Sequence, residues 1–271
     1  RGKCLFRIAR IMQERARELA VAETLNNGKP IKETRDFDVP TAVSWFFYYA
    51  GWADKLDHAG LGPNPQALGV AAQVVPWNFP LMMLAWKIGP SLAAGCSVIV
   101  KPAEQTSLTA LRVAELAHEA GIPRGVLQVL PGDGPSVGEP LGLHMDVDMV
   151  SFTGSTETGK RFLRYAADSN LKKIVLECGG KNPAVVFDDA ENLDHVAEHV
   201  VNAAFWNAGQ NCSATSRLIV HKNVKAPLMA RIEARLRDWK VGDPLNPSTH
   251  IGALIDADHC QKVRGFLDAQ D

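Results

Sequence analysis

The chain has 271 residues, enough for one large hydrophobic core or two smaller ones. A hydrophobic content of 46% with 22% charged residues is ordinary for a folded globular protein and excludes the disordered and fibrous classes. The net charge of −1 gives no electrostatic reason to expect nucleic acid or an anionic membrane as a partner. The five cysteines include no CxxC pair, which argues against a disulfide framework and favours a reducing cytoplasm.

The first third of the chain is predicted to be mostly helical. Apolar residues at helical spacing indicate a helix over 4–27, followed by a glycine and a proline that would end it. An aromatic-rich helix is expected over about 39–56, and a loop over 58–66, which carries two glycines and two prolines. Residues 80–100 are long and apolar enough to resemble a membrane span, but Lys87 and a Gly-Pro pair interrupt them. A buried helix followed by a core strand is therefore expected there.

From residue 68 onward, short apolar strands alternate with helices. Strands are expected at 68–75, 97–100, 126–130, 148–152 and 172–177. Helices are expected from 80, over 108–120, after 134 and over 155–167. This alternation predicts an α/β fold with a parallel sheet covered by helices on both faces. The apolar runs at 184–187 and 217–220, with a helix over about 193–207 between them, predict the start of a second α/β unit.

The segment FTGSTETGKR, residues 152–161, lies between an expected strand and an expected helix. It follows the nucleotide-binding pattern GxxxxGK[ST] up to the last position, where Arg161 replaces the hydroxyl residue that would hold magnesium. The dinucleotide fingerprint GxGxxG is also absent. A glycine-rich turn that exposes N–H groups at a helix N-terminus suits a phosphate, yet a plain turn with Ser155 as helix N-cap explains the segment too. The segment alone leaves phosphate binding open.

Four further polar blocks stand near the ends of the expected strands, where open α/β sheets bind their ligands. They are PWNFP (76–80), KPAEQT (101–106), LECGGKNP (176–183) and GQNCSA (209–214). Together with FTGSTETG, these blocks resemble the aldehyde dehydrogenase superfamily along the whole chain. The resemblance implies a Rossmann-like NAD-binding domain over 1–178, followed by an incomplete catalytic domain over 179–271.

The resemblance also implies covalent oxidation of an aldehyde to a carboxylic acid. Cys212 matches the family's nucleophile, which would add to the carbonyl to give a thiohemiacetal and, after loss of hydride, a thioester. Asn78 matches an amide donor for the oxyanion. Glu177 matches the base that activates water to hydrolyse the thioester. Cys178 stands where leucine is commoner in the family, and we expect it to be a packing residue.

A set of residues, all in these blocks except Gly134, is implied by the resemblance to bind the dinucleotide. They are Pro76, Trp77, Lys101, Glu104, Gly134, Gly154, Ser155 and Thr158. On this basis FTGSTETG holds the pyrophosphate of a dinucleotide and not ATP. The carboxylate of Glu104 could accept hydrogen bonds from ribose hydroxyls but would repel a 2′-phosphate, so NAD is expected in preference to NADP.

A competing constellation is HVAEH, residues 195–199, which spells the inverted zinc-protease motif HxxEH. His195 and His199 would lie one helical turn apart, a competent spacing for two zinc ligands. The same helix carries several charged residues, so an exposed charged helix explains the motif and no metal is expected. A non-catalytic scaffold relative is a second alternative, against which the intact cysteine, glutamate and asparagine count.

The segment 57–68 bears on assembly. In the family, a β-hairpin before the PWNFP block reaches a neighbouring subunit. Here the segment is short, and Pro63 and Pro65 cannot donate ladder hydrogen bonds. We therefore expect a stunted arm and a homodimer or higher homo-oligomer, with a dimer favoured over a tetramer.

The remaining expectations concern the whole protein. We expect a cytoplasmic enzyme whose partner is a small-molecule aldehyde, with neither nucleic acid nor membrane involved. The stretch GDPLNP…IGALID loosely resembles family members that act on amino- or γ-glutamylamino-aldehydes. Because the chain begins without methionine and stops inside an expected helix, we expect it to be incomplete.

Overall fold

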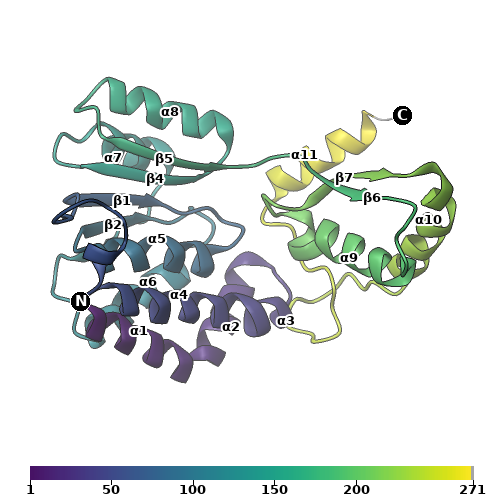
Figure 1. Cartoon of the computed structure of the whole chain (residues 1–271), viewed down its shortest axis with the longest axis horizontal. Coiled ribbons are helices and arrows are strands. Elements are labelled where there is room, and N and C mark those ends of the chain that lie inside the picture. The colour runs from purple at the N-terminus through teal and green to yellow at the C-terminus, as the bar shows by residue number, and fades with distance from the viewer. Residues whose placement is uncertain (270–271) are drawn as a thin grey trace. The chain divides into compact units, whose positions relative to one another are not determined.

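Figure 1 shows the computed structural model of the chain, which describes residues 1–269. The chain divides into two compact units. The first comprises residues 1–27 and 32–178, and the second comprises 28–31 and 179–271. Residues 28–31 therefore belong with the C-terminal half, because Gly28 O accepts a hydrogen bond from Ala253 N at 3.1 Å and Ile31 N donates one to Pro244 O at 2.8 Å. No local signal in the sequence indicated that these four residues pack with the second unit.

The N-terminal region of the chain is mostly helical. Its elements are α1 (Gly2–Glu14), α2 (Ala16–Asn27), α3 (Ile31–Glu33), the π-helical turn η1 (Thr34–Asp38), α4 (Val39–Trp52) and the 3₁₀ turn η2 (Leu56–His58). The single helix expected over 4–27 is thus broken at Arg15, whose φ of −101° and ψ of 15° lie outside the helical range. The second expected helix ends four residues early, at Trp52.

The centre of the first unit is a parallel sheet of five strands in the order β3-β2-β1-β4-β5. The strands are β1 (Val70–Val74), β2 (Ser97–Lys101), β3 (Leu127–Val129), β4 (Met149–Gly154) and β5 (Lys173–Cys178). The helices between them are α5 (Pro80–Ala94), α6 (Leu108–Glu119), the π-helical turn η3 (Gly134–Gly138), α7 (Glu139–Leu143) and α8 (Thr156–Ala167). The predicted α/β architecture with a parallel sheet is confirmed.

Helices cover both faces of this sheet (Figure 1). On one face, Val74, Val150 and Phe152 form an apolar cluster with Phe162 of α8 and Leu141 of α7. The opposite face meets α5, and its contacts there include two polar ones: Gln73 Nε2 donates to Ser91 Oγ at 2.8 Å, and Lys87 Nζ donates to Ser151 Oγ at 2.7 Å. Because strand side chains alternate between faces, one strand supplies both kinds of contact.

The apolar segment 80–100 forms the buried helix α5 and the strand β2, as the sequence indicated. Gly95 ends the helix in the left-handed conformation, with φ of 99°, where glycine is free of the Cβ penalty. Across residues 1–269, no helix combines the length and the apolar character needed to span a membrane.

The second unit contains a two-stranded parallel sheet, β6 (Asn182–Val186) and β7 (Thr215–Val220). Its helical elements are α9 (Leu193–Phe205), the 3₁₀ turn η4 (Trp206–Gly209), α10 (Lys222–Arg237) and α11 (Ala257–Asp268). Its core joins Val186 of the sheet to Ala197 and Val201 of α9 and to Leu228 and Ile232 of α10.

The segment expected to form a stunted arm contains the η2 turn and further turns. No strand is assigned within residues 57–68, all of which the structure describes. The assembly that would follow from this stays a prediction.

Candidate active site

The candidate site in the first unit lies where the strand order reverses. From β1 the chain adds β2 and β3 on one side, and then β4 and β5 on the other. A parallel sheet opens a crevice at such a reversal, beyond the carboxyl ends of the two diverging strands. The register aligns Val74 at the end of β1 with Lys101 of β2 and with Phe152 of β4. The segments that follow these strands are therefore brought to one edge.

A cavity of about 340 Å³ occupies that edge. All eight residues that the sequence analysis assigned to the dinucleotide line it, namely Pro76, Trp77, Lys101, Glu104, Gly134, Gly154, Ser155 and Thr158. They come from strand ends, loops and a helix as much as 82 residues apart in sequence, between Pro76 and Thr158. Thr153 also lines the cavity, and its buried Oγ1 has no hydrogen-bond partner among the described residues of the protein. A buried hydroxyl normally has such a partner.

The loop FTGSTETG forms the N-terminal end of α8 at this cavity. Ser155 is the N-cap, and its Oγ accepts a hydrogen bond from Thr158 N at 3.1 Å. The turn is tight at Gly154, where an added Cβ would lie 2.6 Å from Phe152 Cζ. Helix N–H groups and the positive end of the helix dipole thus face the cavity, an arrangement that favours an anionic group.

At the end of β2 and in the segment that follows it, Lys101 and Glu104 form a pair at the cavity. Lys101 Nζ donates to Glu104 Oε1 at 3.1 Å and to the carbonyl of Pro102 at the same distance. The lysine side chain is 6% exposed and the glutamate 46% exposed. The buried cation therefore holds an accessible carboxylate in place, and this carboxylate is free to accept hydrogen bonds from a ligand.

The PWNFP loop is held by a residue that the sequence analysis missed. Asn27, 2% exposed at the end of α2, donates from Nδ2 to the carbonyl of Trp77 at 2.6 Å. Glu23, on the preceding turn of α2, accepts from Leu81 N at 2.9 Å. These contacts join residues 50 and 58 positions apart. No local pattern could have indicated them, although buried polar residues on a helix face are themselves a signal.

Glu177 lies one residue before the end of β5 and is exposed. Its register partner on β4 is Thr153, and the next pair joins Cys178 to Gly154. The candidate base therefore shares an edge of the sheet with the FTGSTETG loop. Its negative charge also raises the pKa of Lys87, although burial of that lysine has the larger and opposite effect and brings the pKa down to about 8.

Cys178 faces the apolar cluster under α8, as expected of a packing residue. The helix approaches closely at this point: a Cβ added to Gly159 would lie 3.3 Å from Cys178 Sγ. The thiol therefore fills space between the strand and α8.

Cys212 belongs to the second unit and is exposed. Its loop follows an unusual backbone, because Asn207 and Ala208 both have positive φ, 52° and 55°. Such strain in non-glycine residues persists only where the surroundings hold it, and it is frequent at functional sites. Here Asn207 and Gln210 exchange side-chain to backbone hydrogen bonds of 3.2 and 3.3 Å.

A second positioning residue that sequence analysis missed is Asn182, at the start of β6. Its Nδ2 donates to the carbonyl of Cys212 at 2.8 Å and to that of Ala214 at 3.2 Å. This one side chain ties the cysteine loop to the strand that follows LECGG. The three catalytic candidates are thus divided between the units, with Asn78 and Glu177 in the first and Cys212 in the second.

Comparison with known proteins identifies the family. The family model "Aldehyde dehydrogenase family" matches residues 1–270, so the chain belongs to this family. It is 58% identical over 276 residues to an aminoacetaldehyde dehydrogenase of Pseudomonas aeruginosa, covering 99% of this chain and 56% of that protein. The chain therefore spans little more than half the length of this relative.

Solved structures agree with this assignment. The γ-glutamyl-γ-aminobutyraldehyde dehydrogenase of Burkholderia cenocepacia matches with a TM-score of 0.94 and 44% identity, over 99% of this chain and 56% of that one. An indole-3-acetaldehyde dehydrogenase in complex with NAD⁺ matches with the same TM-score, identity and coverage. The resemblance stated from the sequence blocks is confirmed.

Proposed function

We propose that the protein containing this chain oxidises an aldehyde to a carboxylic acid with NAD as cofactor. The observation that carries the proposal is the convergence of eight residues from distant loops on one cavity at the switch point of the sheet. The buried, unpartnered Thr153 Oγ1 and the capped N-terminus of α8 fit a polar, anionic ligand there. A bound nicotinamide would accept the hydride that the substrate loses, which is the chemistry the cofactor supplies.

The covalent part of the reaction is assigned to Cys212. Its thiolate adds to the aldehyde carbon, and the carbonyl electrons move to oxygen to give a thiohemiacetal. The amide of Asn78 would donate to that oxygen, a contact typically worth about 3 kcal/mol in the transition state. Asn27 holds the loop that carries Asn78, and Asn182 holds the backbone of Cys212. Each reacting group thus has a buried or partly buried support.

Release of the acid is assigned to Glu177. Loss of hydride leaves a thioester on Cys212, and water must attack its carbonyl to free the carboxylic acid and regenerate the thiol. Glu177 would take a proton from that water. Its place at the exposed end of β5, on a rigid strand and not on a mobile loop, suits a base that must act repeatedly in one geometry.

The preference for NAD over NADP is assigned to Glu104. Lys101 fixes its carboxylate at the cavity, where the carboxylate can accept hydrogen bonds from the two hydroxyls of a ribose. A 2′-phosphate in the same place would meet a negative charge, and at 4 Å such a repulsion is about 1 to 4 kcal/mol for a site between water and a protein surface.

For the substrate we propose an aldehyde with an amino group. The 58% identity to an aminoacetaldehyde dehydrogenase supports this class, and the match to a γ-glutamyl-γ-aminobutyraldehyde dehydrogenase structure agrees with it. The proposal for the whole protein also includes a cytoplasmic location and a homodimer, which the absence of a strand in residues 57–68 favours over a tetramer joined by strand arms. Tetramers in light scattering would overturn that assembly.

The alternative is a non-catalytic relative, and substitution of Cys212 and Glu177 in the full-length protein separates the two. Cys212→Ala should abolish formation of NADH while leaving NAD binding nearly unchanged. Glu177→Gln should form about one equivalent of NADH per active site in a burst and then stall at the thioester. A parent protein that binds NAD but forms no NADH from any of a panel of amino-aldehydes would favour the non-catalytic alternative.

A further inference from the structure

The HVAEH segment lies on α9, a helix of the second unit that the proposed chemistry does not use. His195 and His199 are both exposed, and their Nε2 atoms are 3.0 Å apart. The ring centroids are 4.3 Å apart, with the ring planes inclined at 73°. Two imidazoles one helical turn apart thus bring the same ring nitrogen of each within hydrogen-bonding distance of the other.

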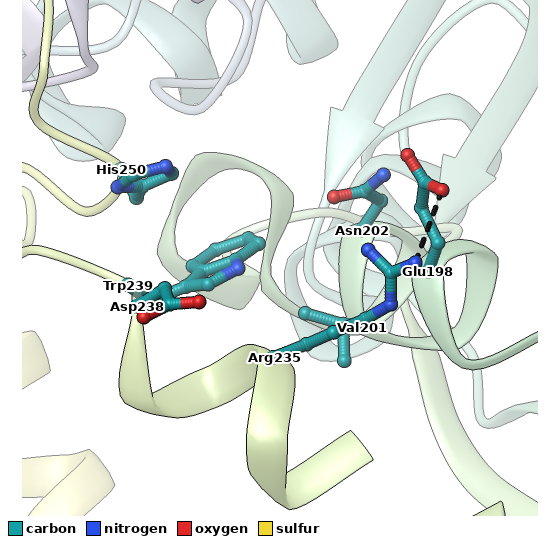
Figure 2. Close-up of a pocket in the computed structure, with 7 residues that line it drawn as sticks. All are labelled: Glu198, Val201, Asn202, Arg235, Asp238, Trp239 and His250. Carbon is teal, nitrogen blue, oxygen red and sulfur yellow. Dashed lines mark ion pairs between the residues drawn. The ribbon is translucent and has the colours of Figure 1, made fainter. Parts of the chain in front are cut away.

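The neighbouring carboxylates are occupied by arginines of α10. Asp194 accepts from Arg231 Nε at 3.1 Å, and Glu198 pairs with Arg235 at 3.4 Å. Figure 2 shows Glu198 turned toward Arg235 in a pocket of about 170 Å³ that Val201, Asn202 and Trp239 also line. Glu198 therefore does not serve as the base that an HxxEH protease would need.

The spacing of the two nitrogens can be compared with metal geometry. Imidazole nitrogens bind transition metals at about 2.0 to 2.1 Å. Two such bonds that end on atoms 3.0 Å apart enclose an angle of about 91 to 97°. That angle belongs to adjacent positions of an octahedral or tetragonal ion, whereas tetrahedral ligands would be more widely spaced.

We propose that His195 and His199 form a two-ligand site for an imidazole-binding transition-metal dication with adjacent coordination positions, Ni²⁺ or Cu²⁺ in character. Within the described residues, no group of three or more His, Cys, Asp or Glu side chains gathers to hold a metal, so water completes the coordination. Metal binding converts the present Nε2 to Nε2 contact into two metal bonds, and the ring protons then reside on Nδ1. The site is independent of the proposed dehydrogenase reaction.

The scaffold under the pair is rigid. Ala197 is 0% exposed and Val201 1% exposed, and both pack into the core between α9 and α10. The N-terminus is capped by Asn192, whose Oδ1 accepts from His195 N at 3.0 Å. The backbone positions of the two histidines are therefore set by the folded helix before a metal arrives, and only their side chains must be ordered on binding.

Calorimetric titration of the metal-free protein with Ni²⁺ tests the proposal. The parent should bind one Ni²⁺ ion. His195→Gln and His199→Gln should each lower the Ni²⁺ affinity by at least about tenfold, because even the loss of a residue that only supports a metal ligand lowers affinity by about that much. His118→Gln is the matched control, because His118 is also an exposed histidine on a helix but has no second histidine one helical turn away. It should leave the affinity unchanged. Any Ni²⁺ that binds to the free thiols also binds to the His195→Gln/His199→Gln double variant. The titration of this variant is therefore subtracted from that of the parent.

Two results would overturn the site. One is equal Ni²⁺ affinity and stoichiometry in the parent and the double variant. The other is a loss in the His118→Gln control as large as the loss in the single variants, which would show nonspecific binding. Far-ultraviolet circular dichroism of each variant establishes that α9 remains folded, and retention of the double variant's helix signal is required for the comparison.

Discussion

The burial of Lys87 predicts how the stability of the fold depends on pH. It is 8% exposed on α5, and its amine donates to Ser151 Oγ on the central strand β4. Burial lowers its pKa from the ordinary 10.5 to about 8, against a smaller upward effect from the charge of Glu177. The folded state therefore releases this proton at a lower pH than the unfolded state does.

The magnitude follows from the gap between the two pKa values. That gap corresponds to about 3 kcal/mol of differential interaction between the charged and the neutral amine. Between about pH 8 and pH 10.5 the unfolded state binds more protons at this site, so the free energy of unfolding rises with pH. Integrated from pH 7 to pH 9.5, the gain from Lys87 is about 2 kcal/mol.

Urea unfolding of the parent and of Lys87→Met across this pH range measures the effect. The difference in unfolding free energy should shift by about 2 kcal/mol in favour of the parent as the pH rises, because the methionine has no proton to release. Ile88→Val, at the next position of α5, is the control and should cost about 1 kcal/mol at every pH. Parallel profiles for the parent and Lys87→Met would refute the assignment. Glu177→Gln should move the parent's rise to lower pH, since it removes the charge that raises the pKa of Lys87.

Three further predictions concern the candidate site. Ser155→Ala removes the N-cap of α8 and should lower the free energy of unfolding in urea by about 1 kcal/mol. The same change should weaken the binding of NAD in calorimetry. An unchanged affinity for NAD would show that Ser155 is not part of the pyrophosphate site. Glu104→Gln should narrow the preference for NAD over NADP in binding titrations by about fivefold or more, since it removes a repulsion of about 1 to 4 kcal/mol. An unchanged ratio of the two affinities would contradict the role given to the charge of Glu104. Asn182→Ala frees the carbonyls of Cys212 and Ala214, so kcat should fall while NAD affinity stays constant, and a parental kcat would show that the cysteine loop holds its geometry without this amide.

Local patterns predicted most of the elements because the forces that form them are local. Short, largely apolar runs mark β1, β2 and β4, and Ser155 is read as a helix cap from its position after a glycine. The break at Arg15 was missed because neither glycine nor proline stands there. Early termination of α4 at Trp52 was missed for the same kind of reason, since the residues beyond it have no strong helix-ending signal before the loop.

The sequence by itself determined the family and the parallel α/β class and supplied the candidate site residues, because motif blocks and apolar periodicity are properties of neighbouring residues. Tertiary structure alone decided which strand ends meet, that Asn27 holds the Trp77 carbonyl, and that Lys87 is buried against Ser151. It also decided that residues 28–31 join the second unit and that Asn182 holds the Cys212 loop. The three hydrogen bonds made by Asn27, Lys87 and Asn182 join residues 30 to 64 positions apart in sequence. A buried polar group without a hydrogen-bond partner costs free energy, so each of these groups must find one once the chain has packed, and no stretch of neighbouring residues encodes which partner that is.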